Sequence, residues 1–79
     1  MNTQTTDRLQ DIFRAVFELP PGSDVTRLRQ MSTPSWDSLA HVALVTAIES
    51  EFEVSLDAAE QLQMTSYNAT SLLLEERGL

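Results

Sequence analysis

The chain has no cysteine and only one histidine among its 79 residues. Without cysteine there is no disulfide framework and no thiolate ligand, and one imidazole cannot complete the ligand set of a structural zinc site. The sequence therefore predicts neither redox chemistry nor a metal site. It also lacks a Gly-x-Ser-x-Gly segment, the turn that exposes the nucleophile of many serine hydrolases. A domain of this size buries only about 60% of its unfolded surface, so a deep catalytic cleft is not expected.

Long apolar runs are also missing. No stretch is long enough to span a bilayer, and the first six residues are polar, with neither the basic start nor the apolar segment of a secretion signal. We therefore expect a cytoplasmic protein without membrane insertion. A single domain over residues 1–79 and a monomeric state are the corresponding expectations.

Positive charge is scarce and unevenly placed. All five basic residues are arginines, none lies from Gln30 to Glu76, and the formal net charge is −7. The same interval holds the acidic residues Asp37, Glu49, Glu51, Glu53, Asp57, Glu60, Glu75 and Glu76. Such a field repels a phosphate backbone and speeds encounter with proteins that carry a basic patch, so nucleic acid is not an expected partner. An acidic surface equally serves simple solubility.

The hydrophobic pattern predicts four helices and no strand. Apolar residues recur at helical spacing over Leu9–Phe17, and Thr6 or Asp7 is the expected N-cap of this first helix. The period is lost over Glu18–Trp36, a loop that is long for a compact domain, and long ordered loops are often functional. Three of its apolar residues are expected to turn back onto the core, with a short helical turn among them: Val25, Leu28 and Met31.

The second helix, from Ser38 to Phe52 or Glu53, is the best defined. Asp37 is its expected N-cap, accepting a hydrogen bond from the backbone N–H of Leu39 or Ala40. At about 100° per residue the side chains separate into two faces. The core face is expected to hold His41, Leu44, Val45, Ile48 and Phe52. The opposite face holds Ser38, Leu39, Val42, Thr46, Glu49 and Glu53, a composition that predicts a docking surface for partner proteins.

Two further helices complete an all-α fold. A short segment over Asp57–Gln63 has Leu56, Ala59 and Leu62 as its apolar set. The fourth runs over Ser66–Arg77, with Tyr67, Leu73 and Leu74 as core residues, and ends at Gly78. The expected architecture is a small four-helix bundle of three longer helices and one short helix, with a long loop between the first two.

Ser38 is the residue whose position suggests chemistry. The only imidazole, His41, lies three residues further on without an evident acid to orient it, so a structural role is expected for it and no catalytic residue is assigned. A serine in the first turn of a helix places a phosphodiester on its hydroxyl beside free N–H groups and the positive end of the helix dipole. The sequence thus favours a modified serine over a catalytic one.

The tripeptide Asp37-Ser38-Leu39 opens the second of four helices after a long loop, and Ala-His-Val-Ala-Leu-Val-Thr-Ala-Ile-Glu-Ser-Glu-Phe follows it. In this setting the chain resembles, over essentially its whole length, the acyl carrier proteins and their peptidyl and aminoacyl carrier relatives. The resemblance implies that a phosphopantetheinyl transferase attaches 4'-phosphopantetheine from coenzyme A to Ser38 with Mg²⁺. The thiol of that arm would hold an acyl or aminoacyl group as a thioester. Asp37 and Leu39 match cofactor-site positions, and Leu39 and Val42 match partner-contacting ones.

Several residues depart from the fatty-acid type of the family. Ala40, His41 and Ala43 stand where acids are usual, which leaves the start of the helix nearly neutral. Trp36 completes a Trp-Asp-Ser-Leu sequence that resembles discrete carriers of polyketide, nonribosomal-peptide and surface-polysaccharide pathways. Trp36 either packs beneath the prosthetic arm or anchors the long loop to the core. Glu53 stands where many relatives have glycine, so the end of this helix departs from the family pattern.

The resemblance also raises the question of the cargo. In the fatty-acid type, a tethered chain can enter the core, and Leu44, Ile48, Phe52 and Leu62 would line such a space here, although they equally fit an ordinary core.

The leading hypothesis is a discrete carrier served by an acyl- or aminoacyl-loading enzyme and by downstream biosynthetic enzymes. A fatty acyl cargo is disfavoured by the neutral helix start, and an aminoacyl or peptidyl carrier is the alternative. A hypothesis of another class is an unmodified helical adaptor that binds partners through Leu39 and Val42, for which Ser38→Ala would leave function intact.

Overall fold

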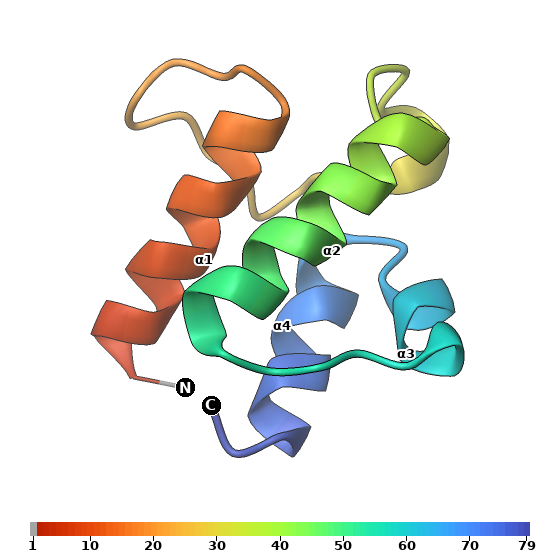
Figure 1. Cartoon of the computed structure of the whole chain (residues 1–79). Helices are drawn as coiled ribbons and strands as arrows, with labels where there is room; N and C mark the ends of the chain where they lie inside the picture. The colour runs from red at the N-terminus through yellow and green to blue at the C-terminus, as the bar shows by residue number, and fades with distance from the viewer. Residues whose placement is uncertain (1) are drawn as a thin grey trace.

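The computed structural model describes residues 2–79. Its elements are, in order, α1 (Thr3–Val16), η1 (Gln30–Ser32), α2 (Ser38–Phe52), α3 (Ala58–Gln63) and α4 (Tyr67–Glu76). No β-strand occurs in this part of the chain, so the expected all-α class, with three longer helices and one short one, is confirmed. α1 packs along α2, and α3 lies beside α4 at the edge of the molecule (Figure 1). Across residues 2–79, no helix is long and apolar enough to cross a membrane.

α1 begins earlier than the sequence pattern indicated. Its N-cap is Asn2, whose side-chain oxygen accepts the backbone N–H of Thr5 at 2.8 Å. The expected cap at Thr6 or Asp7 was therefore wrong. The first turn of α1 is polar and has no apolar repeat, so hydrophobic periodicity indicates the helix only from Leu9 onward. An asparagine cap that satisfies one of the free N–H groups is enough to extend the helix by one turn.

The long connection between α1 and α2 is tied to the core at several points. Val25 is fully buried, Leu28 is half-buried, and an isolated antiparallel bridge joins Arg29 to Ser66. In this bridge the N–H of Gln30 donates to the carbonyl of Thr65 at 2.9 Å, and the N–H of Tyr67 donates to the carbonyl of Leu28 at 3.0 Å. These bonds hold the loop against the start of α4.

The expected short helical turn in this loop is present as η1, but Met31 does not pack on the core. Its side chain is 102% exposed relative to the reference state. The bridge at Arg29 fixes the backbone immediately before η1, and the turn then carries Met31 outward. The expectation that Met31 is a core residue was therefore wrong.

Trp36 anchors the end of the loop. Its side chain is only 3% exposed, and its ring centroid lies 5.7 Å from that of Phe13 and 5.1 Å from that of Phe17. Such edge and tilted contacts between aromatic rings stabilise a core beyond the area that they bury. Trp36 therefore anchors the long loop to the core, which is one of the two roles expected for it.

The remaining core largely follows the expected faces. The apolar residues of α2 and α4 predicted to be buried are buried: Leu44, Val45, Ile48, Phe52, Tyr67, Leu73 and Leu74. Leu56 and Met64, which flank α3, join them. α3 itself turns its apolar side chains differently, because Ala59 and Leu62 are exposed. A helix of six residues has fewer than two turns, so its pattern cannot fix which face is buried.

The end of α2 explains the departure at Glu53. This residue is in the left-handed conformation, with φ 54° and ψ 48°, and its N–H donates to the carbonyl of Glu49. A side chain is disfavoured there, and glycine is the usual residue at such a helix end.

Glu53→Gly is therefore expected to raise the free energy of unfolding by about 0.5–1 kcal/mol, because relief of the left-handed strain exceeds the entropy that glycine adds to the unfolded chain. Urea unfolding followed by circular dichroism measures the change. Glu53→Ala is the control, because it removes the charge but keeps a Cβ atom. A destabilised glycine variant, or an equal gain in the alanine variant, would contradict the strain argument.

Candidate functional site

Ser38 is the first residue of α2, and its side chain is exposed. Asp37 caps the helix as expected: its backbone is extended, and its Oδ1 atom accepts the N–H of Ala40 at 2.9 Å. The carbonyl of Asp37 accepts the N–H of His41 at 2.9 Å. The first N–H groups of a helix have no intrahelical acceptor, so those of Ser38 and Leu39 remain open at the end of α2 that carries the hydroxyl. An anion bound to this hydroxyl is stabilised by the positive end of the helix.

An open depression of about 310 Å³ lies beside this hydroxyl. Three elements form it, with Gln30 from η1, Ser38, His41 and Val42 from α2, and Gln61 and Leu62 from α3. This volume is at the lower end of the range for small-molecule sites. A substituent on Ser38 therefore has space along the surface without any rearrangement of the helices.

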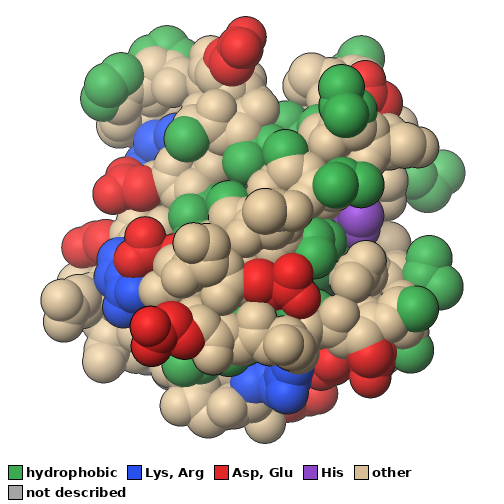
Figure 2. Space-filling model, in the orientation of Figure 1, with side chains coloured by type: hydrophobic (Ala, Val, Ile, Leu, Met, Phe, Trp, Pro, Cys, Tyr) green, Lys and Arg blue, Asp and Glu red, His purple; other side chains and the backbone are tan. Residues whose placement is uncertain are grey.

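Exposed apolar side chains lie on the three elements that form this depression. We call Met31, Leu39, Val42 and Leu62 the apolar surface; they are 102%, 80%, 62% and 79% exposed. In Figure 2, apolar side chains lie around the single histidine, over the start of α2 and over α3, and acidic side chains lie at several places on the same face, including its top. Four of the five large apolar side chains that are exposed within residues 2–79 thus lie on η1, the start of α2 and α3, and the fifth is Leu72.

Two of the four residues of the apolar surface were expected in the core. Leu62 is excluded from any space between the helices, so of the residues proposed to line a tethered chain only Leu44, Ile48 and Phe52 are in the core. Leu62 instead lines the depression beside Ser38, and Met31 lies in η1 next to Gln30, which also lines that depression. Neither position could be found from periodicity, since one lies in the aperiodic loop and the other in a helix too short to define a face. Gln30 and Gln61, which line the depression, carried no sequence signal either.

The predicted partner face of α2 is only partly free. Leu39, Val42 and Thr46 are exposed and lie three and four residues apart, which places them on one side of the helix with Ser38. Glu53 is exposed at the helix end. Glu49 is half-buried, and its Oε2 atom accepts the backbone N–H of Leu56 at 2.8 Å. This bond fixes the connection between α2 and α3.

His41 is held by two hydrogen bonds. The indole N–H of Trp36 donates to Nδ1 at 3.0 Å, and Nε2 lies 2.9 Å from the carbonyl of Gln61. Since an indole N–H can only donate, Nδ1 is the acceptor, and this assigns the donor role to Nε2, toward the carbonyl of Gln61. The ring also stacks on Trp36, with centroids 6.2 Å apart. Both nitrogens are engaged, so His41 is not free to accept the proton of the Ser38 hydroxyl.

His41→Ala is therefore expected to lower the free energy of unfolding by about 1–3 kcal/mol, because it leaves the buried indole N–H of Trp36 without an acceptor. Urea unfolding measures this loss. His41→Phe serves as the control, because it keeps a ring of similar size but neither hydrogen bond, and a similar loss is expected. Any chemistry at Ser38 should persist in the folded fraction of both variants. A folded variant that loses it would contradict a purely structural role.

Within residues 2–79 there is no group of three or more His, Cys, Asp or Glu side chains that could hold a metal ion. Comparison of the chain with protein-family models, with curated proteins and with solved structures found no match.

Proposed function

We propose that the protein is a discrete phosphopantetheine carrier and that Ser38 is its attachment site. The observation that carries the proposal is the exposed serine hydroxyl at the capped N-terminus of α2, open to solvent and beside a surface depression. A carrier needs a hydroxyl that another enzyme can reach, and it needs no general base of its own. Ser38 meets the first requirement, and the engagement of both nitrogens of His41 agrees with the second.

The residues around Ser38 suit a phosphodiester. The N–H groups at the start of α2 stabilise its negative charge. Asp37 keeps its carboxylate on the N–H of Ala40, which holds the first turn of the helix in shape and keeps Ser38 at its first position. A phosphopantetheinyl transferase would supply 4'-phosphopantetheine from coenzyme A with Mg²⁺, and the thiol of the attached arm would carry an acyl or aminoacyl group as a thioester.

The surroundings of Ser38 also bear on the partners of the proposed carrier. The start of α2 is neutral, with Ala43 exposed and Ala40 half-buried against the core, and Leu39, Val42 and Leu62 are exposed near the serine. Partner enzymes would therefore meet apolar side chains near the attachment site and acids further along α2. This pattern favours loading and downstream enzymes of a specialised pathway, of polyketide, nonribosomal-peptide or surface-polysaccharide type. A peptidyl or aminoacyl carrier fits the same residues.

A second candidate function is an unmodified helical adaptor. The observation that favours it is the apolar surface itself, since exposed leucine, valine and methionine side chains bind apolar partner helices without any cofactor. The two functions differ in whether Ser38 is modified.

Intact-protein mass spectrometry tests the proposal. The purified chain is incubated with coenzyme A, Mg²⁺ and a phosphopantetheinyl transferase of broad specificity, alongside a carrier protein that this enzyme is known to modify. A gain of the mass of one phosphopantetheine is the expected result. No gain on the folded chain, with the control carrier modified, would favour the adaptor.

A further inference from the structure

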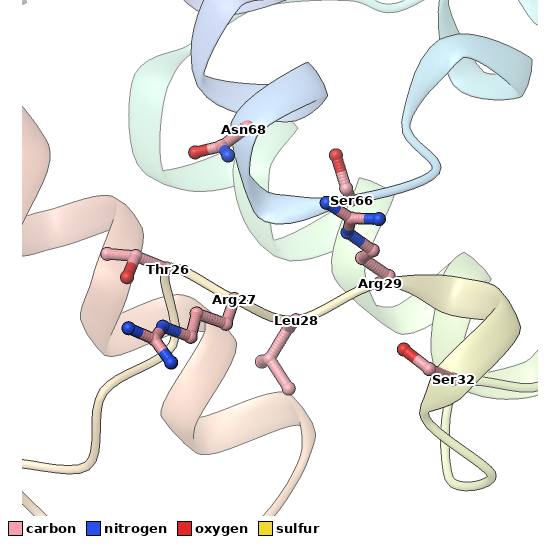
Figure 3. A pocket seen from close by; sticks show the side chains of 7 residues that line it. All are labelled: Thr26, Arg27, Leu28, Arg29, Ser32, Ser66 and Asn68. Carbon is pink, nitrogen blue, oxygen red and sulfur yellow. The ribbon is translucent and has the colours of Figure 1, made fainter.

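A groove lies where the segment before η1 meets the start of α4. Two adjoining depressions, of about 490 and 520 Å³, share Arg29, Ser32, Ser66 and Asn68. Figure 3 shows the first of them from close by. We call the combined feature the arginine groove; its principal residues are Arg27, Leu28, Arg29, Met31, Ser66 and Asn68.

The two arginines of this groove differ from the other three in the chain. Arg8 pairs with Glu51 at 2.7 Å, Arg14 with Asp11 at 3.0 Å, and Arg77 with Glu60 at 3.1 Å. Within residues 2–79 the guanidinium groups of Arg27 and Arg29 make no hydrogen bond and no ion pair, although the chain has twelve acidic residues. Unpaired cations two residues apart in an acidic protein are available to an external anion.

The nearest carboxylate on this segment is already engaged. Asp24 accepts the hydroxyl of Thr26 at 2.6 Å and its N–H at 2.9 Å. These two hydrogen bonds, with a smaller contribution from the field of Arg27, lower the pKa of the Asp24 carboxyl. Asp24 therefore stays ionised and turned toward Thr26.

The groove presents its two positive charges at separate points. In Figure 3 the guanidinium of Arg29 lies toward Ser66, whereas that of Arg27 points away from α4. The backbone between them is fixed by the half-buried Leu28 and by the bridge from Arg29 to Ser66. Two separated charges on a rigid segment match an extended ligand with several carboxylates better than one small ion. Each depression is also larger than a single phosphate needs.

We propose that the arginine groove binds an extended acidic peptide segment of a partner protein. Carboxylates of the segment pair with Arg27 and Arg29, which suits the planar fork of a guanidinium. An apolar side chain of the segment packs on Met31, whose flexible thioether is fully exposed at one end of the groove. The partner would then flank Ser38, because Gln30, which precedes Met31 in η1, lines the depression beside that serine.

A titration followed by nuclear magnetic resonance tests this proposal. The probe is the peptide acetyl-Asp-Glu-Leu-Asp-Glu-amide, added to the isotope-labelled chain at low ionic strength, where surface charge pairs are least screened. Shifts are expected at the backbone amides of residues 26–32 and 65–68 and at the side-chain N–H groups of Arg27 and Arg29. The double variant R27Q/R29Q is expected to weaken binding about tenfold, because it removes both charge pairs.

A matched control separates local contact from overall charge. R8Q/R77Q also removes two positive charges, but from arginines that do not line the groove. This variant is expected to keep a peptide affinity within about twofold of the native value, because the general field of the protein is screened over about 10 Å at moderate salt. Equal loss in both double variants would overturn the proposal. The proposal would also be overturned if the peptide caused no shifts or caused them elsewhere in the chain. Equal shifts with inorganic phosphate would overturn it too, because they would indicate a site for small oxyanions. None of these readouts depends on modification of Ser38.

Discussion

Ser38→Ala is expected to abolish the mass gain of one phosphopantetheine completely, while the native chain is converted under the same conditions. Alanine has no hydroxyl to receive the group, and the proposed attachment site is the serine at the capped start of α2. The fold should survive, because Ser38 is exposed and alanine is a good residue in the first turn of a helix. The loss would therefore report on chemistry and not on stability.

Ser35→Ala is the matched control for this prediction. Ser35 is also exposed, three residues before Ser38, but it lies in the loop and not at the helix start. Its variant is expected to be modified as fast as the native chain. Modification of Ser38→Ala would transfer the site to another hydroxyl and contradict the assignment. If neither the native chain nor Ser35→Ala is modified, the adaptor hypothesis gains, and variants of Leu39 and Val42 become the ones to examine for partner binding.

The largest loss of stability is expected for Trp36→Ala. The indole is buried, contacts the rings of Phe13 and Phe17, and donates its N–H to His41. Truncation of a buried aromatic side chain costs about 3–5 kcal/mol, which is a large part of the total stability of a small domain. The loop before α2 would lose its anchor at the same time. Much of the variant is therefore expected to be unfolded at room temperature.

Circular dichroism during urea unfolding measures this loss, since the variant lacks the tryptophan needed for fluorescence. Trp36→Phe is the partner variant: it keeps an aromatic ring against Phe13 and Phe17 but loses the N–H donor to His41. We expect it to lose less than half as much stability as the alanine variant. An alanine variant as stable as the native chain would show that Trp36 does not hold the loop.

Much of the fold could be predicted from local pattern. α2 has a capping residue, a long apolar stripe and a clear end, so its sequence alone predicts Asp37 as the N-cap and Leu44, Val45, Ile48 and Phe52 as core residues, as the structure has them. These features are local because capping and amphipathicity operate within a few turns of one helix. The start of α1 was placed too late because its polar first turn offers no such repeat.

The surroundings of Ser38 were harder to predict. Met31 and Leu62 are expected in the core because they are apolar, yet both are exposed, and Leu62 lines the depression beside the serine. Their orientation depends on the bridge between Arg29 and Ser66 and on how α3 packs beside α4, which involve residues far apart in the chain. The two bonds of His41 likewise join residues from the loop and from α3.

By itself, the sequence determined the helices, the capped serine and the neutral start of α2, because these depend on the order of neighbouring residues. Only the tertiary structure decided which apolar residues surround Ser38, how His41 is held, and which arginines remain unpaired. The reason is physical: a side chain is buried or exposed, paired or free, according to the segments that pack against it. Those segments are brought together by the core as a whole, and not by the residues next to that side chain in the sequence.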